Sequence, residues 1–215
     1  NYRIKPLHRL IMLSDAYQRS SHASQTAHQQ DPNNQWLSHF SPRRLTAEEI
    51  RDSLLAVSKE LDSLPGEAHP FPPESTWNFS QHAPFHAVYQ TNKRSVYMMV
   101  QRQRRHPFLS LFDGPDPNTS SPVRQQTTVP TQALYFLNDE LFHSYANLTA
   151  SRILASYPAN PMIDELYQLL FQRLPTEAET DITLQFINTY DGTDEQKWQA
   201  LSRILLSSNE FLYVD

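Results

Sequence analysis

The chain has 215 residues, a net charge of −5 and no cysteine. Its length suffices for one domain with a substantial core, and the lack of cysteine excludes disulfides, thiolate metal sites and attachment of c-type haem within the chain. The acidic balance argues against a nucleic-acid partner, and no run approaches the roughly 18 apolar residues that indicate a membrane span.

The first 44 residues combine one helical pattern with a polar connection. Apolar side chains recur at helical spacing in residues 5–19, which predicts a helix that packs inward. Residues 20–44 are rich in His, Gln and Ser. We expect Trp36, Leu37 and Phe40 to anchor this polar segment on the core.

Thr46 and Glu49 mark the start of the next helix, because they have the spacing of a capping box. The apolar stripe of this helix consists of Ile50, Leu54, Val57 and Leu61. Residues 62–93 then show no periodicity, and their prolines exclude a long helix or a central strand. The aromatic residues between Trp77 and Tyr89 predict an ordered loop that covers the core.

Residues 95–101 are the best strand candidate, and a short helix is expected from Pro107 to Phe112. Helical patterns resume at Thr128 and continue to the end of the chain. The last part is predicted to be a three-helix unit, because three helix starts are recognisable in it. They are Asn160 before Pro161, Thr176 with Glu179, and Thr193 with Gln196.

Together these patterns predict a mainly α fold. It consists of an irregular helical domain with long ordered loops, at most one small β element, and the C-terminal three-helix unit. We expect residues 1–158 to form the irregular core and residues 159–215 to pack on the same core as a helical unit.

Five arginines cluster around the predicted strand, where planar guanidinium groups can hold a carboxylate, phosphate or sulfate. They are Arg94, Arg102, Arg104, Arg105 and Arg124. The alternative is that these arginines pair with Asp113, Asp116 and Glu residues of the neighbouring helix. The candidate ligand-binding residues are Arg94, Tyr97, Arg102, Asn118 and Arg124.

The loop that contains Asp113, Asp116 and Asn118 offers oxygen atoms that suit calcium, although it lacks the spacing of an EF-hand. Asx turns explain the same residues without a metal, so no metal site is assigned. We also expect Arg94 or Arg102 to pair with Asp113 or Asp116. The even separation of the two arginines places both on one face of a continuous strand.

Three histidines, His82, His86 and His106, lie beside aromatic residues and prolines. They can form a zinc site only if their side chains converge; otherwise each packs and donates one hydrogen bond. Catalytic residues remain unassigned, with His82, Asp113 and Asp116 as the acid–base candidates. The sequence contains no nucleophile elbow, Walker loop, zinc-protease helix or dinucleotide fingerprint.

Several stretches, in order along nearly the whole chain, resemble the planctomycete family called domain of unknown function 1553. They are Arg43-Arg44-Leu45 with Ile50-Arg51-Asp52-Ser53-Leu54-Leu55, Gln81-His82-x-Pro84-Phe85, Arg94-Ser95-Val96-Tyr97, Leu111-Phe112-Asp113-x-x-Asp116-Pro117-Asn118, Pro130-x-Gln132-Ala133-Leu134, and Ser208 to Asp215.

The resemblance implies an extracytoplasmic module, periplasmic or in the cell envelope, at the C-terminal end of large exported proteins with an upstream cytochrome-c-like region. Haem c would then bind in the upstream domain, and no cofactor is expected in this segment. The implied partners are the upstream domains of the same polypeptide, with polysaccharide or an anionic ligand as a further candidate. The family supplies no established catalytic residues.

Two functions follow as hypotheses. The first is a non-catalytic or partner-dependent module for interaction or ligand binding. The second is an enzyme on envelope or environmental polysaccharide, whose arginines recognise sulfate or uronate groups. An enzyme should bring two titratable groups into a solvent-open pocket, whereas a module should bury such groups in satisfied pairs or expose an apolar docking patch.

Overall fold

The computed structural model describes residues 3–66, 90–102, 104–156 and 162–214. Regular structure in these residues is mainly α-helical with one two-stranded sheet, which confirms the predicted fold class. The chain divides into two compact units, residues 1–44 with 213–215 and residues 45–212. The separate helical unit predicted for residues 159–215 is not tested by this division and stays a prediction.

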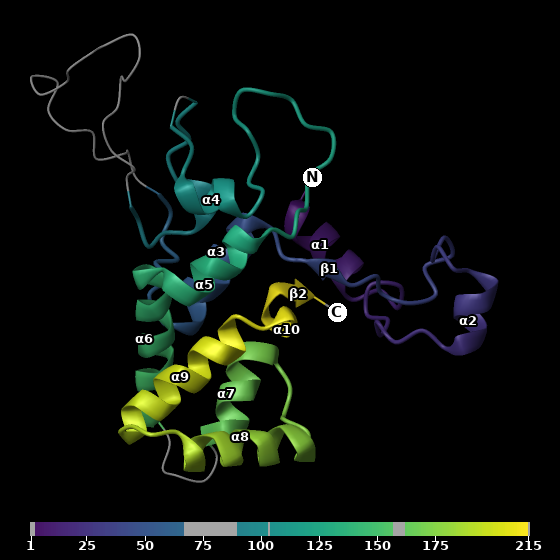
Figure 1. Ribbon diagram of the computed structural model, residues 1–215. Coiled ribbons are helices and arrows are strands. Elements are labelled where there is room, and N and C mark those ends of the chain that lie inside the picture. The colour runs from purple at the N-terminus through teal and green to yellow at the C-terminus, as the bar shows by residue number, and fades with distance from the viewer. Residues whose placement is uncertain (1–2, 67–89, 103, 157–161, 215) are drawn as a thin grey trace, which may run out of the picture. The chain divides into compact units, whose positions relative to one another are not determined.

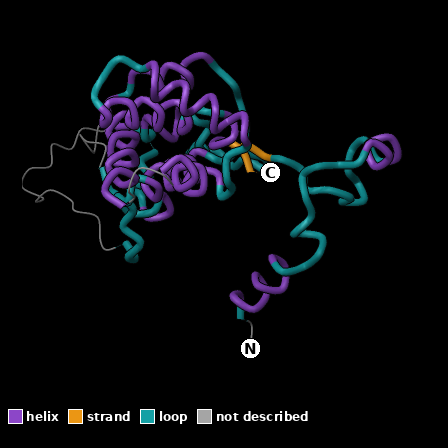
Figure 2. Tube along the Cα trace, turned by 90° about the horizontal axis from the view of Figure 1, so that it is seen from below, coloured by secondary structure: helices purple, strands orange, loops and turns teal. Residues whose placement is uncertain are grey.

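The first unit contains two short helices and the small sheet (Figure 1). They are α1 (Ile4–Met12), α2 (Gln25–Gln30), β1 (Arg43–Arg44) and β2 (Tyr213–Val214). The two strands pair antiparallel, with Arg43 opposite Val214 and Arg44 opposite Tyr213. Figure 2 shows them as the short orange segments beside the C-terminus.

The helix predicted for residues 5–19 is shorter than expected and does not pack inward. It ends at Met12, and none of its residues is buried. Apolar residues at helical spacing predict an amphipathic helix, but they do not show which element packs against its apolar face. The described residues of the first unit include no buried apolar side chain, so the unit has no core of its own against which α1 could pack.

Polar bonds, not apolar anchors, hold the segment after α2. The buried carboxylate of Asp31 accepts hydrogen bonds from the backbone N–H groups of Gln35 at 2.8 Å and Trp36 at 2.7 Å. The predicted anchoring by Trp36 and Leu37 is wrong, because their side chains are 73% and 60% exposed. Phe40 alone is half-buried.

The second unit is a bundle of helices joined by long loops. Its elements are α3 (Ala47–Val57), the 3₁₀ helix η2 (Ser95–Tyr97), α4 (Pro107–Leu111), α5 (Pro130–Asn138), α6 (Glu140–Ser156), α7 (Met162–Phe171), α8 (Glu177–Thr189), α9 (Asp194–Leu206) and α10 (Asn209–Leu212).

The predicted capping boxes form as expected. Thr46 accepts from the backbone of Glu49 while the Glu49 carboxylate accepts from Thr46, and this reciprocal pattern starts α3. The same device starts α8 at Thr176 and α9 at Thr193. The start predicted at Asn160 lies outside the described residues, as does the loop predicted from Trp77 to Tyr89.

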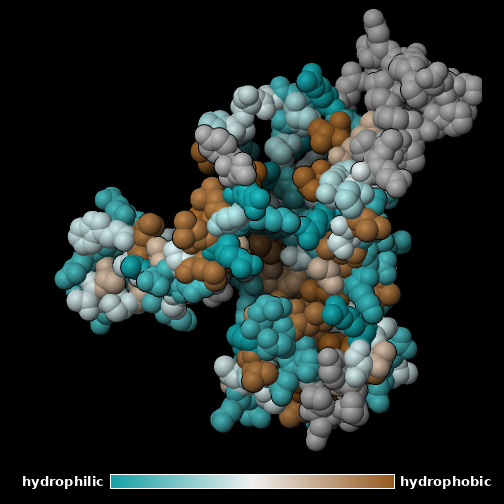
Figure 3. Space-filling view, turned by 180° about the vertical axis from the view of Figure 1, so that it is seen from behind, coloured by the Kyte–Doolittle hydropathy of each residue, from teal (hydrophilic) through white to brown (hydrophobic). Residues whose placement is uncertain are grey.

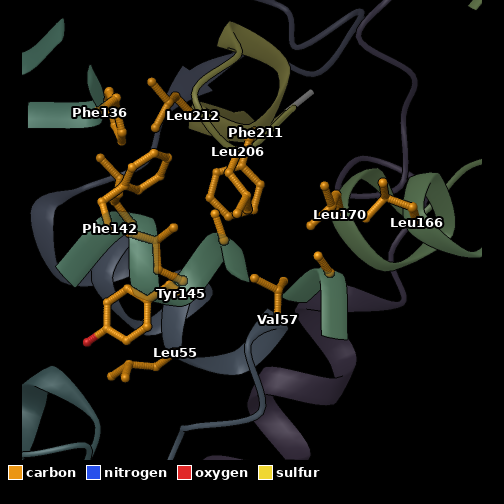
Figure 4. Packing of buried hydrophobic residues seen from close by; sticks show 14 of the residues in the cluster. Leu55, Val57, Phe136, Phe142, Tyr145, Leu166, Leu170, Leu206, Phe211 and Leu212 are labelled. Carbon is orange, nitrogen blue, oxygen red and sulfur yellow. The ribbon is translucent and has the colours of Figure 1, made fainter. Parts of the chain in front are cut away.

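The core of the second unit forms where α6 packs against α9 and α3 (Figure 1). Ile50 and Leu54 of α3, Phe142 of α6 and Leu206 of α9 are fully buried there. Burying each such side chain contributes about 1.5–3 kcal/mol. Figure 4 shows this cluster, with the hydroxyl of Tyr145 (red) at its edge.

The predicted strand at residues 95–101 is wrong. Ser95–Tyr97 forms a 3₁₀ turn instead, and Met98 continues it with extended backbone. A strand requires a partner, and β propensity depends on that context. Here Ser95 bonds to helix α3, since its backbone N–H and hydroxyl both donate to the Asp52 carboxylate at 2.8 and 2.7 Å.

Candidate functional site

Asp113 closes a loop. It lies two residues after the end of helix α4 and has a positive φ of 63°, a conformation that Asp tolerates better than most residues. Its carboxylate accepts from the backbone N–H of Thr127 at 2.7 Å and from the Thr127 hydroxyl at 2.8 Å. The carboxylate therefore joins the two ends of the loop.

Asp116 and Asn118 form the Asx turn that was the alternative to calcium. The Asp116 carboxylate accepts hydrogen bonds from the backbone N–H of Asn118 at 2.9 Å and from its side-chain amide at 3.1 Å. These two bonds lower the pKa of the Asp116 carboxyl. The Asn118 side chain donates to the backbone carbonyl of Arg102 at 2.9 Å. No group of three or more His, Cys, Asp or Glu side chains suited to a metal occurs in the part of the chain that the structure describes.

One arginine near this loop forms an ion pair of the kind that the alternative predicted, since Arg124 pairs with Glu48 of α3 at 2.5 Å. Arg105 instead donates to the backbone carbonyl of Gly114 at 2.6 Å. The ion pairs between described residues do not include one from Arg94 or Arg102 to Asp113 or Asp116, so that hypothesis is wrong. Without a strand, the even residue spacing no longer places the two arginines on one face.

The other predicted site residues remain dispersed. Arg94 and Tyr97 lie exposed at η2, and His82 lies outside the described residues. Ligand binding by Arg94, Tyr97 and the remaining candidates stays a prediction.

A partly enclosed pocket of about 270 Å³ lies among α3, α4, α5 and α6. Its apolar walls are Leu54, Pro107, Phe108, Leu111 and Leu141. Its polar lining residues are Arg51, Gln90, His106, Tyr135, Asp139 and Tyr145. Binding sites for small molecules have this composition, with apolar walls and a few polar groups.

Arg51 forms one wall of the pocket and is only 6% exposed. Its Nη1 donates to the carbonyl of Lys93 at 3.0 Å and to the hydroxyl of Ser95 at 3.2 Å, and its Nη2 donates to the carbonyl of Thr91. Asp52 lies 3.6 Å from Nη1. Burial lowers the pKa of Arg51, but an arginine stays protonated, so the pocket has a fixed positive charge in its wall.

His106 lies at the N-cap of α4, beside Arg51. Both ring nitrogens are buried, and neither has a hydrogen-bond partner among the described residues. Burial lowers the pKa of the imidazole, and the charge of Arg51 lowers it further. A neutral imidazole has one donor and one acceptor, and leaving a buried polar group unpaired costs about 1–3 kcal/mol.

Tyr135 and Asp139 line the pocket at the end of α5. Burial raises the pKa of the Tyr135 hydroxyl well above its ordinary value, and Asp139, with which it makes a hydrogen bond, raises it further. Asp139 also accepts from the backbone N–H of Phe142 at 3.0 Å, at the start of α6. Burial likewise raises the pKa of Tyr145, so both phenols are protonated near neutrality.

These groups can bind and orient a ligand, but their chemistry for catalysis is narrow. Arg51 and Asp139 already bond to the protein, and both tyrosines are protonated. His106 lines the pocket, but both of its ring nitrogens are buried and have no partner among the described residues, so they present no surface to a bound molecule.

Sequence reasoning included His106 as a metal candidate but did not single out the other residues of this pocket. One signal was present: Arg51 lies three and four residues before Leu54 and Leu55, a spacing that places it on the same face of α3 as these apolar residues. For Tyr135 and Tyr145 no signal existed, because an aromatic residue in a helix most often belongs to the core.

One of three comparisons with known proteins found a match, and it agrees with the family resemblance. No curated protein and no solved structure matches the chain significantly. The family model described as PSD1, a protein of unknown function (DUF1553), matches residues 1–187, and the chain therefore belongs to this family.

Proposed function

We propose that this chain is a non-catalytic module that binds a small ligand in the pocket among α3, α4, α5 and α6. The observation that carries the proposal is a partly enclosed pocket of about 270 Å³ with apolar walls and six polar lining residues. Binding sites for small molecules have this composition. Binding of a ligand would cover the apolar walls.

The pocket supports this function better than an exposed docking patch does. Single apolar residues on a surface are ordinary, and only large contiguous patches indicate an interface. On the face shown in Figure 3, brown apolar side chains are interrupted by hydrophilic ones.

An enzyme on polysaccharide has weaker support. Glycoside hydrolysis generally uses two carboxyl groups on either side of the scissile bond. Asp139 is the only carboxylate among the described residues that line the pocket. It already accepts bonds from Tyr135 and Phe142.

Cellular context is a separate proposal that rests on the family resemblance. We infer an extracytoplasmic location, with upstream domains of the same polypeptide as partners and haem c bound there. Neither the location nor the upstream partners depend on the proposed pocket. No helix among the described residues combines the length and apolarity that crossing a membrane requires. Fractionation of the native host, with detection of this segment, tests the location.

A screen of small molecules that differ in charge and shape, by ligand-observed NMR, tests the binding function. We expect compounds that bind the wild-type chain and lose binding in Leu141→Trp, because Leu141 lies at the pocket, is 48% exposed and leaves room for a larger side chain that blocks the entrance. Leu137→Trp is the matched control, since Leu137 is 67% exposed and does not line the pocket. Binding that is equal in all three proteins would contradict the proposal, as would a screen without a ligand.

A further inference from the structure

Helix α1 carries apolar and basic side chains on opposite sides. Ile4, Leu7 and Ile11 recur at separations of three and four residues, so they share one face of the helix. Lys5 and Arg9 are four residues apart and share the other side. α1 is therefore an amphipathic helix whose polar face is basic, and this pattern is typical of helices that lie in the surface of a membrane.

The apolar face of α1 is exposed. None of the residues of α1 is buried, and the side chains of Ile4 and Leu7 are 68% and 53% exposed. The described residues of the first unit include no buried apolar side chain, so this unit offers no core that could cover the face. An apolar face that is continuous and exposed indicates a binding surface, whereas single exposed apolar residues do not.

The charge of the same part of the chain indicates the chemistry of the partner. Residues 1–44 contain six Lys or Arg and two Asp, a formal charge of +4, although the whole chain has a charge of −5. Helix α1 itself contains Lys5 and Arg9 and no acidic residue. The ion pairs between described residues do not involve these two side chains. Their charges are therefore available to an anionic surface.

A lipid surface matches both sides of α1 at once. A bilayer with anionic lipids has negative headgroups directly above hydrocarbon, so a helix that lies in its plane can bury an apolar face while its basic side chains stay among the phosphates. A second copy of the chain fits less well, because the basic residues of two α1 helices would repel each other when their apolar faces meet.

We propose that α1 binds the surface of a membrane that contains anionic lipids. Ile4, Leu7 and Ile11 insert below the headgroups, and Lys5 and Arg9 contact the phosphates. With nine residues the helix is far shorter than the roughly 20 that a span requires, so it lies in the plane of the membrane. The binding is reversible, since a short helix buries little apolar area. This surface is separate from the proposed ligand pocket and does not depend on it.

Cosedimentation of the full chain with lipid vesicles tests the proposal. One set of vesicles contains phosphatidylglycerol and phosphatidylcholine in equal parts, and the other contains phosphatidylcholine alone. We expect at least about tenfold tighter binding to the anionic vesicles, because each basic residue near the surface adds to the attraction. Raising sodium chloride from about 50 mM to about 500 mM should weaken that binding, since salt screens it. Equal binding to both sets, or binding to neither, would overturn the proposal.

Two pairs of variants assign the binding to α1. Leu7→Gln should weaken binding to anionic vesicles about tenfold or more, because a buried leucine is lost. Leu184→Gln is its matched control, since Leu184 lies on α8 and is 45% exposed. Lys5→Gln should weaken binding about fivefold, the effect of one charge, and Lys59→Gln, at another exposed lysine, less than about twofold. Equal affinities within either pair would contradict the proposed surface.

A fluorescent label tests which side of α1 inserts. The chain has no cysteine, so one introduced cysteine gives a single labelled position. With an environment-sensitive fluorophore at Ile11→Cys we expect a blue shift on saturating anionic vesicles, and at Arg9→Cys little change, because the two positions lie on opposite sides of the helix. Equal shifts at both positions would overturn the proposed orientation.

Analytical ultracentrifugation without vesicles tests the other occupant of this face. We expect the wild-type chain and Leu7→Gln to have the same oligomeric state. A dimer that Leu7→Gln dissociates, in a chain that does not bind vesicles, would assign the apolar face of α1 to a second copy and overturn the membrane proposal.

Discussion

The loop from Asp113 to Thr127 and the pocket both contain polar groups, but these groups differ in how they are bonded. In the loop the carboxylates of Asp113 and Asp116 are half-buried and accept hydrogen bonds from Thr127 and Asn118. In the pocket the buried Arg51 is hydrogen-bonded, whereas both buried ring nitrogens of His106 lack a partner among the described residues. The loop has the denser charges in the sequence, but the unpaired buried group lies in the pocket.

The largest expected effect is a loss of stability when Arg51 in the pocket wall is replaced. Arg51→Met removes a buried charge and leaves the carbonyls of Thr91 and Lys93 without their donor. We expect the free energy of unfolding to fall by about 3–5 kcal/mol, as measured by urea denaturation. Arg124→Met in the exposed pair is the control, with a loss of at most about 1 kcal/mol. Equal losses of unfolding free energy in the two variants would contradict the distinction between the buried Arg51 and the exposed Arg124.

The next prediction concerns close backbone packing at Gly114, in the same loop. A Cβ on Gly114 would lie 2.7 Å from the carbonyl oxygen of Leu109, where backbone leaves no room. Gly114→Ala should cost about 1–3 kcal/mol. In Gly192→Ala the closest atom, at 2.9 Å, belongs to the flexible side chain of Gln196, so thermal unfolding should show a smaller loss.

His106→Phe should raise stability by about 1 kcal/mol, because it replaces an unpaired buried group with an apolar one. The gain should increase as the pH falls below about 6.5, the ordinary pKa of histidine. The pKa of His106 is lowered in the folded state, so the unfolded state binds the proton more readily and acid destabilises the wild type.

Urea midpoints of both proteins at pH 7.5 and pH 5.5 measure the difference. Above the unfolded pKa neither state binds this proton, and the slope from His106 disappears. A wild type that loses no more stability than His106→Phe over this interval would show that the imidazole has a partner in solution.

The smallest effect concerns the exposed ion pair of Arg124 and Glu48. A double-mutant cycle with Arg124→Gln and Glu48→Gln should give a coupling of about 0–1 kcal/mol, since solvent screens the pair. Ligand affinity at the pocket should not change in either variant. A coupling energy well above this range would show that this ion pair stabilises the fold substantially.

Local signals in the sequence predicted much of the helical structure. The capping boxes at Thr46, Thr176 and Thr193 depend on residues three apart, so short-range spacing suffices to place those helix starts. The stripe of α3 is buried as predicted at Ile50 and Leu54. Residues 95–101 were misassigned, because strand formation depends on a partner that local sequence does not reveal.

The family, the mainly α class and the helix starts follow from residue type and short-range spacing, so they can be predicted without a structure. Which polar residues meet depends instead on contacts between distant parts of the chain. Arg51, His106, Tyr135 and Asp139 come from separate parts of the chain, and their convergence depends on how the helices pack. Whether a charge is exposed and paired or buried beside an unpartnered group is likewise set by that packing.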